Sequence, residues 1–251
     1  MDIERFNSAC DFVTGSSLPQ KGIGTLSEKT LHAVLKRYFE PDSESHEIKI
    51  GRYVADIVGE NGIIEIQTAG LDKLRKKLEV FLSVTQVTVV HPVARTRWLS
   101  WVDPETGEML PKRKSPRKGS AFDAFYELYK IKMLLNNPNL NLCIVVLDME
   151  EYRFLTKKGE RKRRGSTRME RIPTALIEEI HITCPQDYIQ LIPTGLPEKF
   201  TTKDYSAAAK IHLRYAQTAL NVLAAVGAVS KTGTQGRLTE YMVSCNNADT
   251  L

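Results

Sequence analysis

The sequence predicts an α/β protein with a core over residues 1–183 and a smaller second domain over residues 184–251. Three observations lead to this prediction. Apolar and polar residues alternate over Glu47–Thr68, as they do in half-buried strands joined by tight turns. Segments with a helical stripe of apolar residues come before and after these strands. From Pro185 onward, helical segments precede a hairpin with glycine at its tip, which indicates a unit of a different kind.

The composition is that of a globular protein and argues against several classes of protein. Of the 251 residues, 42% are hydrophobic and 26% are charged, and no apolar run reaches membrane length. The N-terminal residues lack the apolar segment of a signal peptide. Four widely spaced cysteines without CxxC, and five histidines without HxH or HExxH, argue against a disulfide framework or a zinc site. We therefore expect a cytoplasmic protein with no membrane partner.

The hairpin within Glu47–Thr68 contains the principal candidate site. Its turn spans Gly59–Gly62, and a symmetric turn there sets Asp56 opposite Glu65. Gln67 lies on the same face as Glu65, because side chains alternate along a strand. Two facing carboxylates repel each other and weaken a sheet, unless a cation lies between them. Because carboxylate oxygens suit Mg²⁺ and Mn²⁺, Asp56 and Glu65 are predicted metal ligands.

Asp56, followed after the hairpin by Glu65-Ile66-Gln67, resembles the D…(D/E)-x-K motif of the PD-(D/E)XK nucleases, the restriction-endonuclease-like superfamily. The stretch Glu47–Leu82 is similar to an uncharacterised bacterial group of that superfamily. This resemblance implies a core made of a helix, a three-stranded antiparallel meander, a helix and a parallel strand. It also implies catalytic roles for Asp56, Glu65 and Gln67. Gln67 stands where the family usually has lysine, and some members take a lysine from the next helix, here Lys73, Lys76 or Lys77.

Glu28 has two interpretations. The segment from Gly24 to Glu28 resembles the one that often supplies an extra acidic residue in these nucleases, so Glu28 would complete the metal shell through water. The same residues match a capping box, in which Glu28 bonds the first backbone N–H of a helix over 26–39. Both interpretations stay open at this point.

The remaining elements follow from the spacing of apolar residues. Residues 1–23 are expected to be an irregular lead-in with at most one short turn of helix. The spacing predicts helices over 26–39, 71–83, 120–135 and 173–180, strands over 85–91, 95–102 and 142–147, and a strand pair over 149–170. The strand over 85–91 follows a strand and a helix, so it is expected to lie parallel beside the hairpin.

Two basic segments stand out against a modest net charge of +5. The first contains Lys112, Arg113, Lys114, Arg117 and Lys118; the second contains Arg161, Lys162, Arg163 and Arg164. Such blocks suit a polyanionic backbone, although solvated loops often have the same composition. Nearby, Trp98 and Trp101 either cover the edge of a sheet or expose one ring for stacking on a base.

The C-terminal segment, with its helices and glycine-tipped hairpin, resembles a winged helix-turn-helix domain. Its core stripe would be Leu213, Ala216, Leu220, Leu223 and Ala224. The residues expected to face a DNA groove are Lys210, His212, Arg214 and Gln217, and those on the wing are Lys231 and Arg237. Winged domains also dock other proteins, so DNA contact is one of two expectations here.

These observations lead to a functional hypothesis, a Mg²⁺- or Mn²⁺-dependent endonuclease acting on DNA. Asp56 and Glu65 would hold the metal, Gln67 would orient the attacking water, and Lys77 or a neighbour would supply the missing positive charge. Many nucleases of this kind pair up to cut both strands, so a homodimer is a possible state. Two alternatives remain: an inactive nuclease fold that serves as a scaffold, and a transcription regulator that binds DNA without metal.

Overall fold

The computed structural model describes residues 1–17, 30–103, 106–155 and 166–244. The chain folds into two compact units, each assembled from segments that are far apart in sequence. The first unit comprises Met1–Gly59, Pro92–Ser120 and Val145–Glu179; the second comprises Glu60–His91, Ala121–Ile144 and Ile180–Leu251. The boundary predicted between residues 183 and 184 falls within the second unit, between β7 (Ser166–Ile182) and η5 (Pro185–Leu191).

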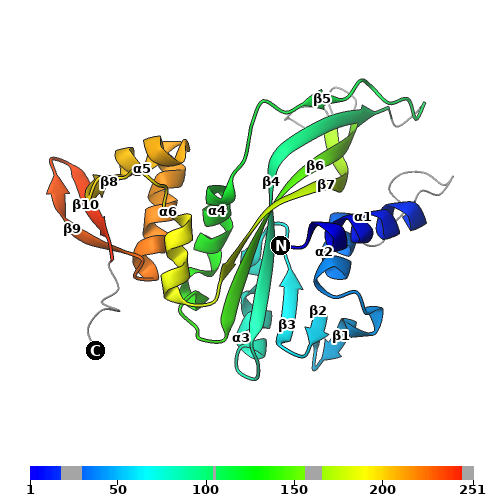
Figure 1. Cartoon of the computed structure of the whole chain (residues 1–251), viewed down its shortest axis with the longest axis horizontal. Helices are drawn as coiled ribbons and strands as arrows, with labels where there is room; N and C mark the ends of the chain where they lie inside the picture. Colours follow the sequence, from blue (N-terminus) through cyan, green and yellow to red (C-terminus); the bar gives the residue numbers. More distant parts are fainter. Residues whose placement is uncertain (18–29, 104–105, 156–165, 245–251) are drawn as a thin grey trace. The chain divides into compact units, whose positions relative to one another are not determined.

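The fold is mixed α/β, as the sequence predicts, with one large and mostly antiparallel sheet. Its strands are β1 (His46–Ile50), β2 (Tyr53–Gly59), β3 (Gly62–Ile66), β4 (Val87–Val102), β5 (Arg113–Lys114), β6 (Leu140–Leu155) and β7. They follow the order β1-β2-β3-β4-β6-β7, with β5 paired to β4 (Figure 1). β1 and β2 pair antiparallel, with His46 opposite Ile57, whereas β3 and β4 pair in parallel, with Ile63 opposite Val87. The three short strands and the parallel strand are therefore confirmed.

Two strands are longer than the sequence predicts. β4 runs without interruption for 16 residues through the two strands expected over 85–91 and 95–102. β7 runs for 17 residues, so the helix prediction over 173–180 was wrong. The buried residues of this segment, Pro173, Leu176 and Ile180, are spaced by three and four positions. Together with the apolar residues at 176, 177 and 180 this spacing fits a helical stripe, which explains the error.

The first unit begins with a helix where an irregular lead-in was expected. Helix α1 (Ile3–Ser17) lies beside α2 (Thr30–Phe39) (Figure 1). Phe6 is fully buried, and its ring meets the edge of the Tyr38 ring with centroids 5.7 Å apart. The prediction failed because Phe6 and Ala9 are the only fully buried residues described in α1, and two positions make too short a stripe to recognise.

The second unit contains the helices that follow β3. The helix predicted over 71–83 is confirmed as η2 (Leu71–Leu74) continuing into α3 (Arg75–Phe81). The helix predicted over 120–135 is present as three consecutive helical pieces with a kink at Ile131, namely η3 (Ala121–Ala124), α4 (Phe125–Leu128) and η4 (Tyr129–Leu134).

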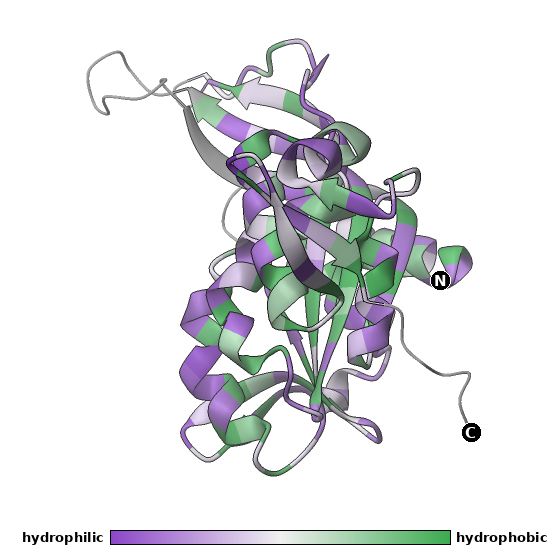
Figure 2. Ribbon diagram, turned by 90° about the vertical axis from the view of Figure 1, so that its left-hand side faces the viewer, coloured by the Kyte–Doolittle hydropathy of each residue, from purple (hydrophilic) through white to green (hydrophobic). Residues whose placement is uncertain are grey.

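The C-terminal part of the second unit has its own small sheet. Its elements after η5 are β8 (Lys199–Thr201), α5 (Thr202–Ala209), α6 (Leu213–Ala225), β9 (Val229–Gln235) and β10 (Leu238–Val243), and the strand order is β8-β10-β9. Thr201 and Asp204 form a capping box that starts α5. The helices carry hydrophobic and hydrophilic residues on different sides, as Figure 2 shows. In α6 the buried stripe includes Ala216, Leu220 and Leu223 as predicted, whereas Leu213 is exposed.

Candidate functional site

In the first unit, the predicted metal ligand Asp56 lies in β2 next to a histidine of α2. The Oδ2 atom of Asp56 is 3.3 Å from the Nε2 atom of His32, and both side chains are partly exposed, by 21% and 24%. The sequence analysis did not single out His32, because the histidine lies 24 residues earlier in the chain and forms no recognised motif. The pair places a carboxylate and an imidazole within hydrogen-bonding distance at the surface of this unit.

In the second unit, the other predicted ligand, Glu65, forms an ion pair with Lys77. Glu65 lies in β3 and its side chain is only 2% exposed, whereas that of Lys77, in α3, is 15% exposed. The Nζ atom of Lys77 donates a hydrogen bond of 2.5 Å to Oε2 of Glu65. A buried carboxylate without a partner is costly, so this contact stabilises the ionised form of Glu65 in the apolar interior.

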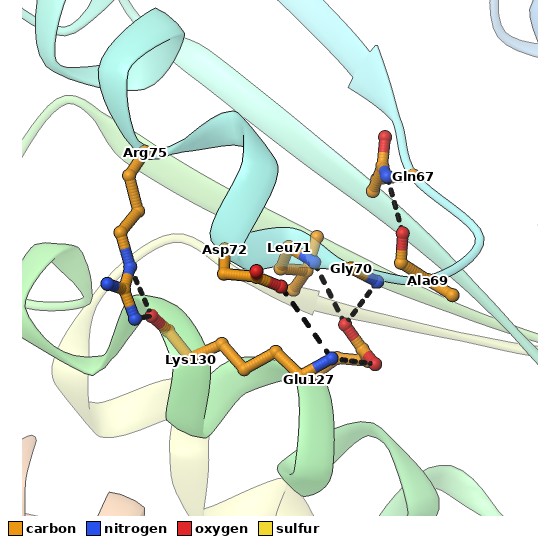
Figure 3. Close-up of polar contacts among 8 residues, drawn as sticks. All are labelled: Gln67, Ala69, Gly70, Leu71, Asp72, Arg75, Glu127 and Lys130. Atoms are coloured by element: carbon orange, nitrogen blue, oxygen red, sulfur yellow. Dashed lines mark hydrogen bonds and ion pairs between the residues drawn. The ribbon is translucent and has the colours of Figure 1, made fainter.

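Gln67 follows directly after β3 and takes part in a short chain of polar contacts. Its Nε2 atom donates to the carbonyl oxygen of Ala69 at 2.5 Å (Figure 3), and its own carbonyl oxygen lies 2.7 Å from Nδ1 of the buried His91. The side chain and the backbone of residue 67 are therefore both held in place, at the position where the resemblance expects a lysine.

A buried glutamate that the sequence analysis did not single out holds the loop after Gln67. Gly70 has a left-handed conformation (φ 74°), and its N–H and that of Leu71 donate to Oε2 of Glu127 at 2.6 and 2.9 Å (Figure 3). Lys130 donates to the other carboxylate oxygen at 2.6 Å and also lies 3.7 Å from Asp72. Burial raises the pKa of Glu127, but the hydrogen bonds from Lys130 and Leu71 outweigh burial and leave this pKa below its ordinary value.

The Glu127 contacts predict a pH-dependent contribution to stability. Because folding lowers the pKa of Glu127, its carboxylate stabilises the fold at any pH above the ordinary glutamate pKa of about 4.3. This stabilisation is lost as the pH falls through the lower pKa that Glu127 has in the folded state. We expect Glu127→Gln to cost about 1.5–3 kcal/mol at pH 7. Urea unfolding at pH 7, 5 and 3 measures the difference in unfolding free energy between the wild type and Glu127→Gln, and this gap should narrow at the lowest pH. Asp72→Asn, half exposed beside the same lysine, is the control. A gap that stays constant with pH would contradict the prediction.

The first basic segment lies along β4 in the first unit. All five of its predicted residues, Lys112, Arg113, Lys114, Arg117 and Lys118, are exposed. The Lys112 ammonium forms an ion pair with Glu150. The guanidinium of Arg113 lies 4.4 Å from the centre of the Trp101 ring, and Lys112 and Lys114 both lie within 6 Å of the Trp98 ring. Trp98, which is 36% exposed, therefore sits among cationic side chains instead of packing only against the sheet.

Several predicted site residues lie outside the residues that the structure describes. They are Glu28 and the second basic segment, Arg161, Lys162, Arg163 and Arg164. The residues predicted in the C-terminal part, Lys210, Arg214, Gln217, Lys231 and Arg237, are all exposed. His212 caps the start of α6, because its Nδ1 accepts a hydrogen bond from the Arg214 N–H at 3.2 Å.

The described part of the chain contains neither a group of metal-ligating side chains nor a helix that could span a membrane. No three histidine, cysteine, aspartate or glutamate side chains among these residues gather as they would around a metal ion. No helix among them combines the length and the apolar character needed to cross a membrane. None of the described cysteines, Cys10, Cys143 and Cys184, is joined to another in a disulfide.

Comparison with known proteins relates this chain to a domain family and to a protein of Treponema pallidum. The DUF8091 domain, a domain of unknown function, matches residues 29–183, a range that contains Asp56, Glu65 and Lys77. An uncharacterised protein of Treponema pallidum (strain Nichols) is 31% identical over 196 residues, which is 77% of this chain and 78% of the relative. No solved structure matches the chain. The chain belongs to the family defined by the DUF8091 domain.

Proposed function

We propose that this protein is a metal-dependent nuclease acting on DNA, as the resemblance of Asp56 and Glu65-Ile66-Gln67 to the nuclease motif implies. The observation that carries the proposal is the 2.5 Å ion pair between Glu65 and Lys77. The motif lacks its usual lysine, and Lys77 brings an ammonium from the following helix to the second carboxylate of the motif. The other two candidate lysines, Lys73 and Lys76, are exposed.

Lys77 can serve both the carboxylate and a substrate. An ammonium has three N–H donors, so one can bond Glu65 while another donates to a phosphate oxygen. A fixed positive charge beside the scissile phosphate stabilises the negative charge that develops as the phosphodiester bond breaks. The amide oxygen of Gln67 is an acceptor that can orient the attacking water, while the amide nitrogen is held by the Ala69 carbonyl.

The donor chemistry of Asp56 and Glu65 suits Mg²⁺ or Mn²⁺, because both ions prefer carboxylate oxygens. Asp56 is partly exposed and accessible to a hydrated cation, whereas Glu65 is buried and its charge is balanced by Lys77. The pairing of Asp56 with Glu65 rests on the sequence motif alone. When bound, the metal would polarise the scissile phosphate and lower the pKa of the attacking water.

The C-terminal elements support DNA binding through a winged helix-turn-helix arrangement. A short helix, a strand, two helices and a hairpin follow one another, and the first strand pairs with the last to give the order β8-β10-β9. In this interpretation α6 enters the groove through Arg214 and Gln217, which are exposed at its start and in its second turn, and the β9–β10 hairpin is the wing.

A plasmid-nicking assay with Mg²⁺ or Mn²⁺ tests this function. We expect Asp56→Asn to lower nicking by roughly 10²-fold or more, since even groups that only support metal ligands contribute 10- to 100-fold. Asp148→Asn is the matched control, because Asp148 lies in the same unit with a similarly exposed side chain (20%, against 21%) and pairs with Arg95. A separate measurement tests the C-terminal part. Arg214→Gln should weaken DNA binding, measured in EDTA so that no cleavage occurs.

Two results would contradict the proposal. Equal nicking by the wild type and Asp56→Asn would remove Asp56 from the reaction. No metal-dependent nicking by the wild type, despite DNA binding, would favour the inactive scaffold. Binding to one DNA sequence in the absence of metal would favour the transcription regulator instead.

A further inference from the structure

The first unit contains a buried carboxylate surrounded by three arginines from three neighbouring strands. The side chain of Glu151, in β6, has no solvent exposure. Arg153 of the same strand donates from Nε at 2.7 Å and from Nη2 at 2.5 Å to Oε1, and Arg171 of β7 donates to Oε2 at 3.3 Å. Arg97 of β4 approaches Oε2 to 3.9 Å, the outer limit of an ion pair.

Three guanidinium groups converge on one carboxylate in this cluster. The arginine side chains remain 21–28% exposed, so they are accessible from solvent while their carboxylate is not. Positive charges that lie this close together and reach solvent attract an anion.

The anion that suits such a cluster is a phosphate. A guanidinium is a planar fork of N–H donors that matches two oxygens of one phosphate, and Glu151 holds Arg153 and Arg171 in fixed orientations. Fixing these long side chains in advance reduces the entropy that binding would otherwise cost.

The surroundings of Arg97 point to a chain of phosphates and not to a single one. The basic segment runs back along β4, since the Ser115 N–H donates to the Arg97 carbonyl at 2.8 Å and the Gly119 N–H donates to the Arg95 carbonyl at 2.9 Å. Arg113 lies opposite Leu99 in the β4–β5 pairing, two residues after Arg97. Because side chains alternate along a strand, Arg113 lies on the same face as Arg97, whereas Trp98 and Lys114 lie on the other face. An exposed cation therefore follows Arg97 on its own face of the sheet, as a nucleic-acid backbone requires.

We propose that Arg97, Arg153 and Arg171, held by Glu151, bind a backbone phosphate of DNA, and that Arg113 continues this surface. The inference takes DNA as the ligand from the proposed function, but it does not depend on cleavage. It assigns to this part of the sheet a phosphate-binding role distinct from the roles of Asp56 and Glu65.

Fluorescence anisotropy with labelled single-stranded and duplex oligonucleotides, in EDTA and over a range of salt concentrations, tests the proposal on the full chain. The informative variant is Arg97→Gln, because it leaves Arg153 and Arg171 on Glu151 and should preserve the fold. We expect about tenfold weaker binding to unrelated sequences, and a fall of about 1 in the slope of log K against log salt. Arg95→Gln is the matched control, since Arg95 lies two residues away on β4 with its own partner, Asp148.

Arg97→Lys, which keeps the charge and loses the fork, should bind DNA with an affinity between those of the wild type and Arg97→Gln. Equal affinity and salt slope for the wild type and Arg97→Gln, with both folded by circular dichroism, would overturn the proposal. So would displacement of the oligonucleotide by millimolar inorganic phosphate, which would indicate a site for a small anion. If Arg97→Gln loses binding while the wild type shows no metal-dependent nicking, the phosphate site stands and the nuclease proposal fails.

Discussion

Lys77→Met is expected to lower the free energy of unfolding by about 3–5 kcal/mol, because it leaves the buried carboxylate of Glu65 without its ammonium partner. Urea denaturation followed by circular dichroism measures this loss. Lys76→Met is the matched control: it removes the neighbouring charge of the same helix from an exposed position and should change stability by less than about 0.5 kcal/mol. A loss below about 1 kcal/mol for Lys77→Met would mean that other groups suffice to stabilise Glu65.

A double variant separates the structural role of the ion pair from a functional one. Apolar groups of similar volume often replace a buried ion pair without loss of stability. Glu65→Leu with Lys77→Met should therefore recover most of the stability that Lys77→Met alone loses. If the recovered protein no longer nicks DNA, the pair serves the reaction beyond its contribution to the fold.

Gly62→Ala is expected to lower the free energy of unfolding by about 3 kcal/mol or more, because backbone strain and a steric clash add at this position. Gly62 begins β3 with φ +105°, a conformation that L-residues rarely adopt, and an added Cβ would lie 2.3 Å from the backbone oxygen of Gln86. That oxygen also accepts the Ile63 N–H at 2.9 Å, at the start of the pairing between β3 and β4. The backbone cannot move aside without disturbing the strand that carries Glu65. Thermal and urea unfolding of the purified variant measure the cost.

Gly51→Ala provides the comparison for this prediction. Gly51 also has a positive φ, of 59°, but an added Cβ there would meet no atom within 4 Å. Its substitution should cost only about 1–2 kcal/mol, the penalty of the left-handed conformation alone. Equal losses for the two alanine variants would show that the close approach at Gly62 has no energetic weight.

The sequence predicts correctly those parts of the fold in which the apolar residues recur with one clear spacing, either that of a strand or that of a helix. Alternation over Glu47–Thr68 and the apolar stripes after it predict three strands, a helix and a parallel strand, and all are present. The segment 173–180 has buried residues at helical spacing, Pro173, Leu176 and Ile180, and only its neighbours in the sheet hold it in an extended conformation. In α1, burial depends on Phe6 and Tyr38, which meet across 32 residues of sequence and leave no local pattern.

The candidate site was predictable in type but not in detail. The sequence offers three lysines after the hairpin, and the choice among them depends on the phase of the helix. η2 is a tighter 3₁₀ turn that continues into α3, so Lys73 and Lys76 emerge toward solvent while Lys77 meets Glu65. The arginine cluster on Glu151 draws on three strands, and no spacing rule joins residues 97, 151 and 171.

Pro173, in the outer strand β7, has a consequence for self-association. A sheet grows between molecules when one copy adds its edge strand to the edge of another, and this requires backbone N–H and carbonyl groups on both sides. Proline has no N–H to offer, and its carbonyl already lies 3.8 Å from the Cys10 thiol of α1. Hydrogen bonding to another strand is therefore interrupted at this point of β7, so we expect a dimer to form through another surface than a β7–β7 pair.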